Sequence, residues 1–114
     1  MSEKVIIGLI EEVIIRGNGQ ERIVRARIDT GAAYSSVDTH LAAELQLGPI
    51  AEVKTIKSAN GNRVRAAIRT EVEIKGKKYA ATLTLADRSH MKYDILIGRD
   101  VLMQGFLIDP KKEV

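Results

Sequence analysis

The sequence predicts a mostly β domain with one or two short helices. Its 114 residues contain many short runs rich in valine and isoleucine, and several runs alternate apolar and polar side chains. That alternation has the period of a strand with one buried face. Turn-forming pairs separate the runs, most clearly Asn18-Gly19 and Asn60-Gly61. A chain of this length is expected to form one domain, residues 1–114, around a single core.

Composition excludes several classes of chemistry. Aromatic residues make up only 4% of the chain and tryptophan is absent, so the core must be aliphatic. Without cysteine there is no disulfide, no thiolate catalysis and no cysteine-based zinc site. His40 and His90 are too few for a histidine-rich metal centre, and we expect no metal and no cofactor.

The net charge of +3 comes from a basic surplus in the second half of the chain. The surplus gathers in residues 63–78, where Glu71 and Glu73 interrupt it. Few aromatic side chains are available to stack on bases, so a solvated strand face is a better interpretation than a nucleic-acid site. The apolar run at residues 5–10 is too short for a signal peptide or a membrane helix. We therefore expect a soluble, cytoplasmic protein without a nucleic-acid or membrane partner.

In the first half of the chain, residues 5–10 and 13–15 are predicted strands, with Glu11-Glu12 closing the first. Residues 17–20 form a hairpin turn, and residues 22–28 return as a strand with one apolar face. A short strand at 34–37 and a helix at 40–45, capped by Asp38-Thr39, follow.

The second half begins with a strand at 50–57 and a turn centred on Asn60-Gly61. Residues 63–74 alternate clearly, so Val64 is placed on the buried face of a long strand. The remaining predicted elements are a returning strand at 79–85, a polar loop at 86–93, an apolar strand at 94–98, a short helix at 99–104, a last strand at 106–108 and a loose tail at 111–114.

The strand that ends at Ile28 runs directly into Asp29-Thr30-Gly31-Ala32. A carboxylate that follows an apolar strand face is expected to be partly buried, and burial of a charge requires a reason. Two interpretations remain open at this point: a functional carboxylate, or an aspartate that caps its own turn.

Two motifs stand in order, Ile28-Asp29-Thr30-Gly31-Ala32 and Ile95-Leu96-Ile97-Gly98-Arg99-Asp100, with a hairpin between them. From about residue 22 to residue 106 the chain resembles the retropepsins, the single-lobed aspartic proteases of the retroviral type. It is more similar still to small prokaryotic retropepsin-like proteins, including those known as ATP-dependent zinc proteases and those associated with ATP-grasp ligases. The resemblance implies a single-lobed, closed β-barrel with one or two short helices. No cluster of His or Cys residues supports the zinc.

The resemblance also implies a mechanism in which two aspartates share one proton and activate a water. This chain has one Asp-Thr-Gly, so the second Asp29 would come from a second copy in a homodimer. Asp29, Thr30 and Gly31 would be catalytic. The positions expected to bind substrate are Ala32 and the flap tip Ser58, Ala59, Asn60 and Gly61. The positions expected to support the site are Ile97, Gly98 and Arg99.

These inferences predict an aspartic endopeptidase that cleaves peptide or unfolded protein substrates. The polar flap tip departs from the glycine-rich, apolar flap of retroviral enzymes and favours an alternative. In that alternative, the chain is a non-proteolytic binding module that serves a ligase or another protein partner. A basic nucleic-acid-binding β-protein is the weaker third hypothesis.

Overall fold

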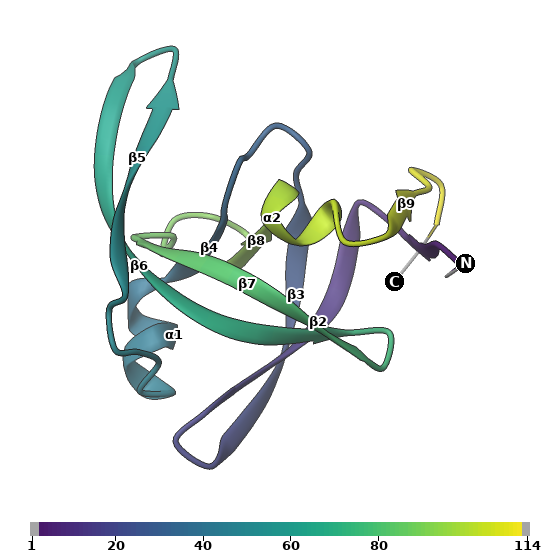
Figure 1. Ribbon diagram of the computed structural model, residues 1–114, viewed down its shortest axis with the longest axis horizontal. Coiled ribbons are helices and arrows are strands. Elements are labelled where there is room, and N and C mark those ends of the chain that lie inside the picture. Colours follow the sequence, from purple (N-terminus) through teal and green to yellow (C-terminus); the bar gives the residue numbers. More distant parts are fainter. Residues whose placement is uncertain (1–2, 113–114) are drawn as a thin grey trace.

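The computed structural model describes residues 3–112, which form nine strands and two short helices (Figure 1). The strands are β1 (Val5–Ile7), β2 (Ile10–Gly17), β3 (Gln20–Ile28), β4 (Ser35–Asp38), β5 (Glu52–Ser58), β6 (Gly61–Ile74), β7 (Lys77–Ala86), β8 (Ile95–Ile97) and β9 (Phe106–Ile108). The helices are α1 (Thr39–Glu44), which Asp38 caps, and α2 (Arg99–Leu102). The predicted elements are therefore confirmed, with differences at several boundaries.

Six strands close into a barrel. The hydrogen-bonded order is β2-β3-β8-β4-β7-β6, and β6 pairs again with β2. Strand β8 lies parallel to β3 and antiparallel to β4, so the two predicted motifs share one part of the barrel wall. The closed, mostly β architecture confirms the predicted fold class.

The core of the barrel is aliphatic, as the composition predicts. Its largest fully buried side chains are Ile7, Val13, Ile15, Val37, Leu45, Ile68, Val72, Ile74, Leu83, Ile95, Ile97 and Val101. Among aromatic residues, Tyr79 is buried and packs against Phe106, with ring centroids 4.6 Å apart. Burial of these apolar side chains is the main term that stabilises the fold.

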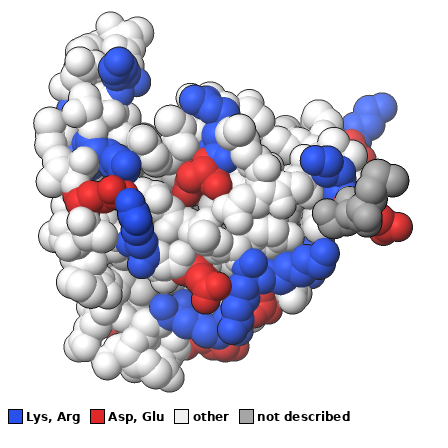
Figure 2. All heavy atoms as spheres, viewed as in Figure 1, with Lys and Arg blue, Asp and Glu red and all other residues white. Residues whose placement is uncertain are grey.

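Strand β6 is too long for the barrel and continues beyond it. Its residues 67–74 pair with β7, whereas residues 61–66 pair with β5 alone. This two-stranded extension, residues 52–67, projects from the barrel and is called the arm (Figures 1 and 2). Val64 lies on it and is 70% exposed, so its predicted burial was wrong. Alternation places residues on a common face but does not ensure that anything covers that face.

The tip of the arm differs from the prediction by one residue. Ser58 pairs with Gly61, so Ala59 and Asn60 form the centre of the turn. Gly61 has φ +110, whereas Asn60 is not left-handed. A type I turn followed by a left-handed glycine accounts for this pattern better than the Asn-Gly turn that the sequence predicts. At Asn18-Gly19 both residues have positive φ, which confirms the other predicted turn.

At the start of the chain, Glu11 does not end a strand. It lies inside β2, is 3% exposed and accepts a hydrogen bond from the Gly8 N–H. Burial raises the pKa of the Glu11 carboxyl, but Gly8, Lys112 and Lys75 outweigh burial and lower the pKa overall. The buried glutamate therefore links three separate segments of the chain.

The two ends of the described chain lie together, on the opposite side of the barrel from the arm (Figure 1). Strands β1 and β9 pair in parallel, and Lys112 Nζ binds both the Ile6 carbonyl and Glu11. The prediction of a loose tail was therefore wrong for Lys112, while residues 113–114 lie outside the described residues. Within residues 3–112, neither helix is long and apolar enough to cross a membrane.

Candidate active site

Asp29 directly follows β3 and is half-buried, as the strand pattern predicts. Its Oδ1 accepts a hydrogen bond of 2.8 Å from the Gly31 N–H, and its carbonyl accepts one of 3.3 Å from the Ala32 N–H. An ordinary turn aspartate makes the same contacts. The surroundings of the loop must therefore distinguish a functional carboxylate from a structural one.

Residues 97–99 hold the loop from behind, and we call them the clamp. The Ile97 carbonyl accepts a hydrogen bond of 2.9 Å from the Asp29 N–H, and the Arg99 N–H donates one of 2.8 Å to the Ala32 carbonyl. Between them, a Cβ on Gly98 would lie 2.6 Å from the Tyr34 oxygen and 2.8 Å from the Ala32 oxygen. Only glycine allows this approach, so both ends of the Asp29 loop rest on the clamp.

The side chain of Arg99 extends the same support. Its Nη1 donates a hydrogen bond of 2.8 Å to the Thr30 carbonyl. Thr30 itself is exposed at the surface of the single chain. The three predicted support positions therefore all contact the Asp29 loop. Ile97 does so through its carbonyl, Gly98 through close packing, and Arg99 through both its N–H and its side chain.

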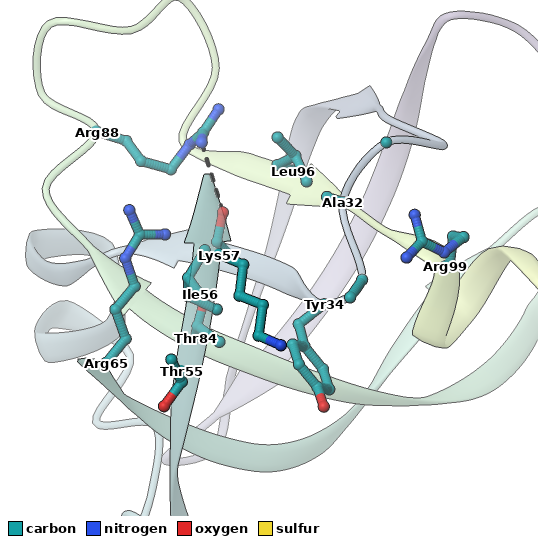
Figure 3. A pocket seen from close by; sticks show the side chains of 13 residues that line it. Ala32, Tyr34, Thr55, Ile56, Lys57, Arg65, Thr84, Arg88, Leu96 and Arg99 are labelled. Atoms are coloured by element: carbon teal, nitrogen blue, oxygen red, sulfur yellow. Dashed lines mark hydrogen bonds between the residues drawn. The ribbon is translucent and has the colours of Figure 1, made fainter. Parts of the chain in front are cut away.

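A cavity of about 450 Å³ lies between the Asp29 loop and the arm (Figure 3). Its lining residues are Gly31, Ala32, Ala33, Tyr34, Ser36, Thr55, Ile56, Lys57, Arg65, Thr84, Arg88, Leu96 and Arg99. The volume is within the usual range of small-molecule and cofactor sites. Of the predicted substrate-binding positions, Ala32 lines this cavity, whereas the tip residues 58–61 do not. Residues 55–57, further down the arm, contribute instead.

The cavity is strongly basic. Figure 3 shows the guanidinium groups of Arg65 and Arg88 near one another at one end, with Arg99 beyond Ala32 and Tyr34. Within residues 3–112, neither Arg65 nor Arg88 has a carboxylate at ion-pair distance. Asp38 and Asp94 attract Arg88 only from beyond ion-pair distance, so the cavity presents positive charge that no close ion pair within these residues neutralises.

Arg88 is held in place by neutral groups. Its Nε donates to the Tyr93 carbonyl at 2.9 Å and its Nη1 to Ser36 Oγ at 3.4 Å. Burial lowers the pKa of the Arg88 guanidinium, and the nearby charge of Arg65 lowers it further. An arginine nevertheless keeps its proton in proteins, so a buried cation faces the cavity.

Sequence reasoning missed Arg88, which falls within a segment predicted to be polar loop. For Arg65 the sequence favours a solvated strand face over contact with acidic substrates. The loop that contains Arg88 folds back on the barrel, where the Arg88 N–H donates to Asp38 Oδ1 at 2.7 Å. No local pattern indicates a contact across 50 residues. Within residues 3–112, no three His, Asp or Glu side chains gather in a way that could hold a metal ion.

A solved structure has the same fold. It is the crystal structure of Lpg0085, a protein of unknown function from Legionella pneumophila, with a TM-score of 0.66. The match covers 94% of both chains at 19% sequence identity, which supports a likeness of fold alone.

A closed barrel with an Asp-Thr-Gly loop facing a hairpin arm defines a retropepsin-like domain. The chain belongs to the RimB-like family, whose model, described as retropepsin-like aspartic endopeptidase RimB, matches residues 38–114. This confirms the resemblance that the two sequence motifs indicate. The matched segment contains the arm, Arg88 and the clamp, and it begins nine residues after Asp29.

Curated relatives carry a different name. A probable alpha-L-glutamate ligase of Parasynechococcus marenigrum is 26% identical over 136 residues and matches 97% of this chain. Another, from Desulfotalea psychrophila, is 35% identical over 113 residues and matches 76% of the chain. The match spans only 29% and 24% of the lengths of these relatives.

Proposed function

We propose that this chain is a homodimeric aspartic endopeptidase that hydrolyses peptide bonds with two Asp29 carboxylates, one from each chain. The observation that carries the proposal is the held position of Asp29. Its loop rests on the clamp through the Asp29 N–H and the Ala32 carbonyl, and the cavity begins at Gly31, two residues after Asp29. A turn aspartate with a purely local role needs neither the clamp nor the cavity.

The chemistry follows from the proximity of two like charges. Two carboxylates brought together cannot both ionise, so the pair shares one proton. The ionised member takes a proton from water, and the resulting hydroxide attacks the peptide carbonyl carbon. The protonated member donates to the carbonyl oxygen. Collapse of the tetrahedral intermediate then breaks the C–N bond, with a proton transferred to the amine.

Dimerisation is required because the chain contains one Asp-Thr-Gly. Asp29 and Thr30 lie at the surface of the single chain, where a two-fold axis could bring them to their images. The paired strands β1 and β9 also expose apolar side chains, Ile6 at 51% and Leu107 at 53%, at directly opposite positions. Such a face is suited to contact with a second copy.

The basic cavity supports a substrate class. Arg65 and Arg88 line the cavity, and neither forms an ion pair with a carboxylate of residues 3–112, so a carboxylate of the substrate can take that place. Two curated relatives are named for ligation of alpha-L-glutamate. We therefore propose that the substrate is a peptide segment rich in glutamate. It would be cleaved between residues whose side chains bind Arg65 and Arg88.

The decisive experiment compares wild type with Asp29→Asn on a glutamate-rich peptide and on its glutamine-matched counterpart, from pH 3 to 8. Cleavage by wild type and none by Asp29→Asn, at equal folded fraction, supports the peptidase. Equal turnover by the two proteins would rule it out. Sedimentation with an uncleaved peptide analogue tests the dimer, since a strictly monomeric protein could not assemble the pair.

A second candidate is a non-proteolytic module that binds a ligase or another protein partner. The names of the curated relatives favour it, and so does the polar arm tip, where Ser58 Oγ bonds to the Gly61 carbonyl. Asp29→Asn distinguishes the two candidates. A binding module keeps its affinity for the partner after this substitution and cleaves nothing before it.

A further inference from the structure

Asp100 lies directly after the clamp, at the start of α2, and its carboxylate lies between Ser35 and Thr82. Its Oδ1 accepts hydrogen bonds from the Ser35 N–H at 2.9 Å and from Ser35 Oγ at 2.7 Å. Its Oδ2 accepts one from the Thr82 N–H at 2.8 Å. The carboxylate thus joins α2 to the beginning of β4 and to β7.

Ser35 extends this connection to the clamp. Its hydroxyl oxygen accepts a hydrogen bond of 3.0 Å from the Gly98 N–H, and its O–H donates a hydrogen bond to the Asp100 carboxylate. Ser35 is fully buried, so water cannot replace either contact. Asp100 also uses its backbone, because its N–H donates to the Ala33 carbonyl at 3.2 Å. The hydrogen bonds that join Gly98 to Ser35 and Ser35 to Asp100 therefore fix both the clamp and the end of the Asp29 loop.

We propose that Asp100 is a positioning residue, which acts through Ser35 and Gly98 to hold Asp29 where the reaction needs it. The inference rests on the proposed peptidase activity of Asp29. The Asp100 carboxylate binds Ser35 and Thr82 rather than Asp29, and Asp100 does not itself line the cavity, so its effect is on geometry. Displacement of a reacting group by about 1 Å can lower a rate about 100-fold, and the proposed effect is of this kind.

The contacts of Asp100 require a carboxylate. Three donors converge on it, and both of its oxygens accept. An asparagine has one accepting oxygen and one donating NH₂ group, so in either orientation the NH₂ would face an N–H donor. Asp100→Asn keeps the size and shape of the side chain while it breaks the connection to Ser35 or to Thr82.

The chain contains a matched control. Asp87 Oδ1 accepts from the Ser89 N–H at 3.0 Å and from Ser89 Oγ at 2.7 Å, the same pair of contacts that Asp100 makes with Ser35. Asp87 is exposed in the loop before β8, and its hydrogen bonds stay within that loop. Asp87→Asn therefore removes a similar carboxylate–serine contact without reaching the clamp.

The test measures kcat and KM for a glutamate-rich peptide with wild type, Asp100→Asn and Asp87→Asn. We expect kcat of Asp100→Asn to fall between about 10-fold and about 100-fold, with KM within about 2-fold of wild type. Asp87→Asn should keep both constants. Circular dichroism and thermal melting restrict the comparison to the folded fraction. An unchanged kcat for folded Asp100→Asn overturns the inference, and so does an equal fall in the Asp87→Asn control.

A second variant keeps the inference testable if Asp100→Asn does not fold. Ser35→Ala removes the hydroxyl between Gly98 and Asp100, and we expect the same fall in kcat and faster amide hydrogen exchange at Gly98. If both variants fold, the double variant should be no slower than the slower single one, because the residues act as a unit. Fully additive losses would overturn the inference. An inactive wild type would instead refute the proposed peptidase, which keeps the two failures distinct.

Discussion

The Asp29 loop and the arm face each other across one cavity, and they are held in opposite ways. The loop is fixed from several directions, by backbone bonds to Ile97 and Arg99 and by the close approach of Gly98. The arm is a two-stranded ribbon, and its outer residues, including Val64, are exposed. Two contacts outside its own ladder hold the arm. At its base Arg69 donates a hydrogen bond to the Glu52 carboxylate, and further along Lys54 Nζ lies 4.9 Å from the Tyr34 ring centroid.

This difference assigns separate tasks to the two regions. A group that takes part in proton transfer needs a fixed position, and the close-packed backbone of the clamp supplies it. A segment that must admit and release a peptide needs few tertiary contacts, since such segments open at low free energy. If rigidity belongs to the clamp alone, substitutions in the clamp should cost more than comparable substitutions in the arm.

The largest effect is expected from Gly98→Ala. The new Cβ would lie 2.6 Å from the Tyr34 oxygen, and backbone must move to relieve the contact. We expect a loss of about 3 kcal/mol in the free energy of unfolding, as for severe overpacking, together with loss of peptidase activity. Urea denaturation and peptide cleavage measure the two effects. Wild-type stability in this variant would show that the loop does not rest on the clamp.

Gly61→Ala provides the contrast on the arm. Nothing lies within 4 Å of the added Cβ, and only the backbone, at φ +110, resists the change. The cost should be at most about 1–2 kcal/mol, because strain at an L-residue is small and the arm can open locally. Gly105→Ala, at φ +116 and also in open space, is the matched control for strain away from the arm. A change in KM for Gly61→Ala alone would place the effect in substrate binding.

The two arginines of the cavity compare the regions directly, because Arg88 is pre-positioned on the barrel and Arg65 belongs to the arm. We expect Arg88→Met to lower kcat/KM for a glutamate-rich peptide about 30-fold, which corresponds to about 2 kcal/mol for a charge-assisted contact. Arg65→Met should lower it only about 5-fold, since the arm must be ordered to use that charge. Steady-state kinetics on the glutamine-matched peptide provides the control for both variants. A larger fall in kcat/KM for Arg65→Met than for Arg88→Met would show that the arm is the better-ordered region.

The same comparison predicts a pH dependence for selectivity. A glutamate side chain of the substrate ionises near pH 4.3, whereas arginine stays charged. The preference for glutamate over glutamine peptides should therefore rise between about pH 4 and pH 6 in wild type. In Arg88→Met the rise should be much smaller. A preference that does not change with pH would mean that charge does not select the substrate.

The sequence predicts the rigid region better than the arm. The contacts of Gly98 and Arg99 with the Asp29 loop follow from short motifs that carry local geometry, and the barrel strands follow from alternation that matches burial. Val64 was misplaced because the same alternation continues where no second layer covers the strand. Asp100 ends the second motif, but the sequence assigns it no role, since its partner Ser35 is 65 residues away. Contacts of that span depend on the closed barrel and leave no local pattern.

The network around Glu11, near the two chain ends, is held by several contacts as the clamp is, but it lies away from the Asp29 loop. Glu11 binds Gly8, Lys112 and Lys75, which together lower its pKa although burial opposes them. A lowered carboxyl pKa stabilises the fold above the unfolded value of roughly pH 4–5, and this stability is lost as the pH falls through the folded value. Glu11→Gln should therefore cost about 1–2 kcal/mol at pH 7 and much less at pH 3.

Urea denaturation at the two pH values measures this difference, with the exposed neighbour Glu12→Gln as control. The control should stay within about 0.5 kcal/mol of wild type. At pH 7, kcat of folded Glu11→Gln should remain that of wild type, because the network does not touch the clamp. A loss of kcat would join the chain ends to the site, and an equal cost at both pH values would exclude the charge as the cause.

The smallest effect is expected at the arm tip. Ser58 Oγ donates a hydrogen bond of 2.8 Å to the Gly61 carbonyl, in a turn where water can take its place. Ser58→Ala should change the free energy of unfolding by less than about 0.5 kcal/mol, as is usual at exposed positions. It should leave kcat unchanged and shift KM by less than about 3-fold, because the tip does not line the cavity in the single chain. A 10-fold fall in kcat would instead show that the tip closes on the reacting bond, so that the arm shares the precision of the clamp once substrate is bound.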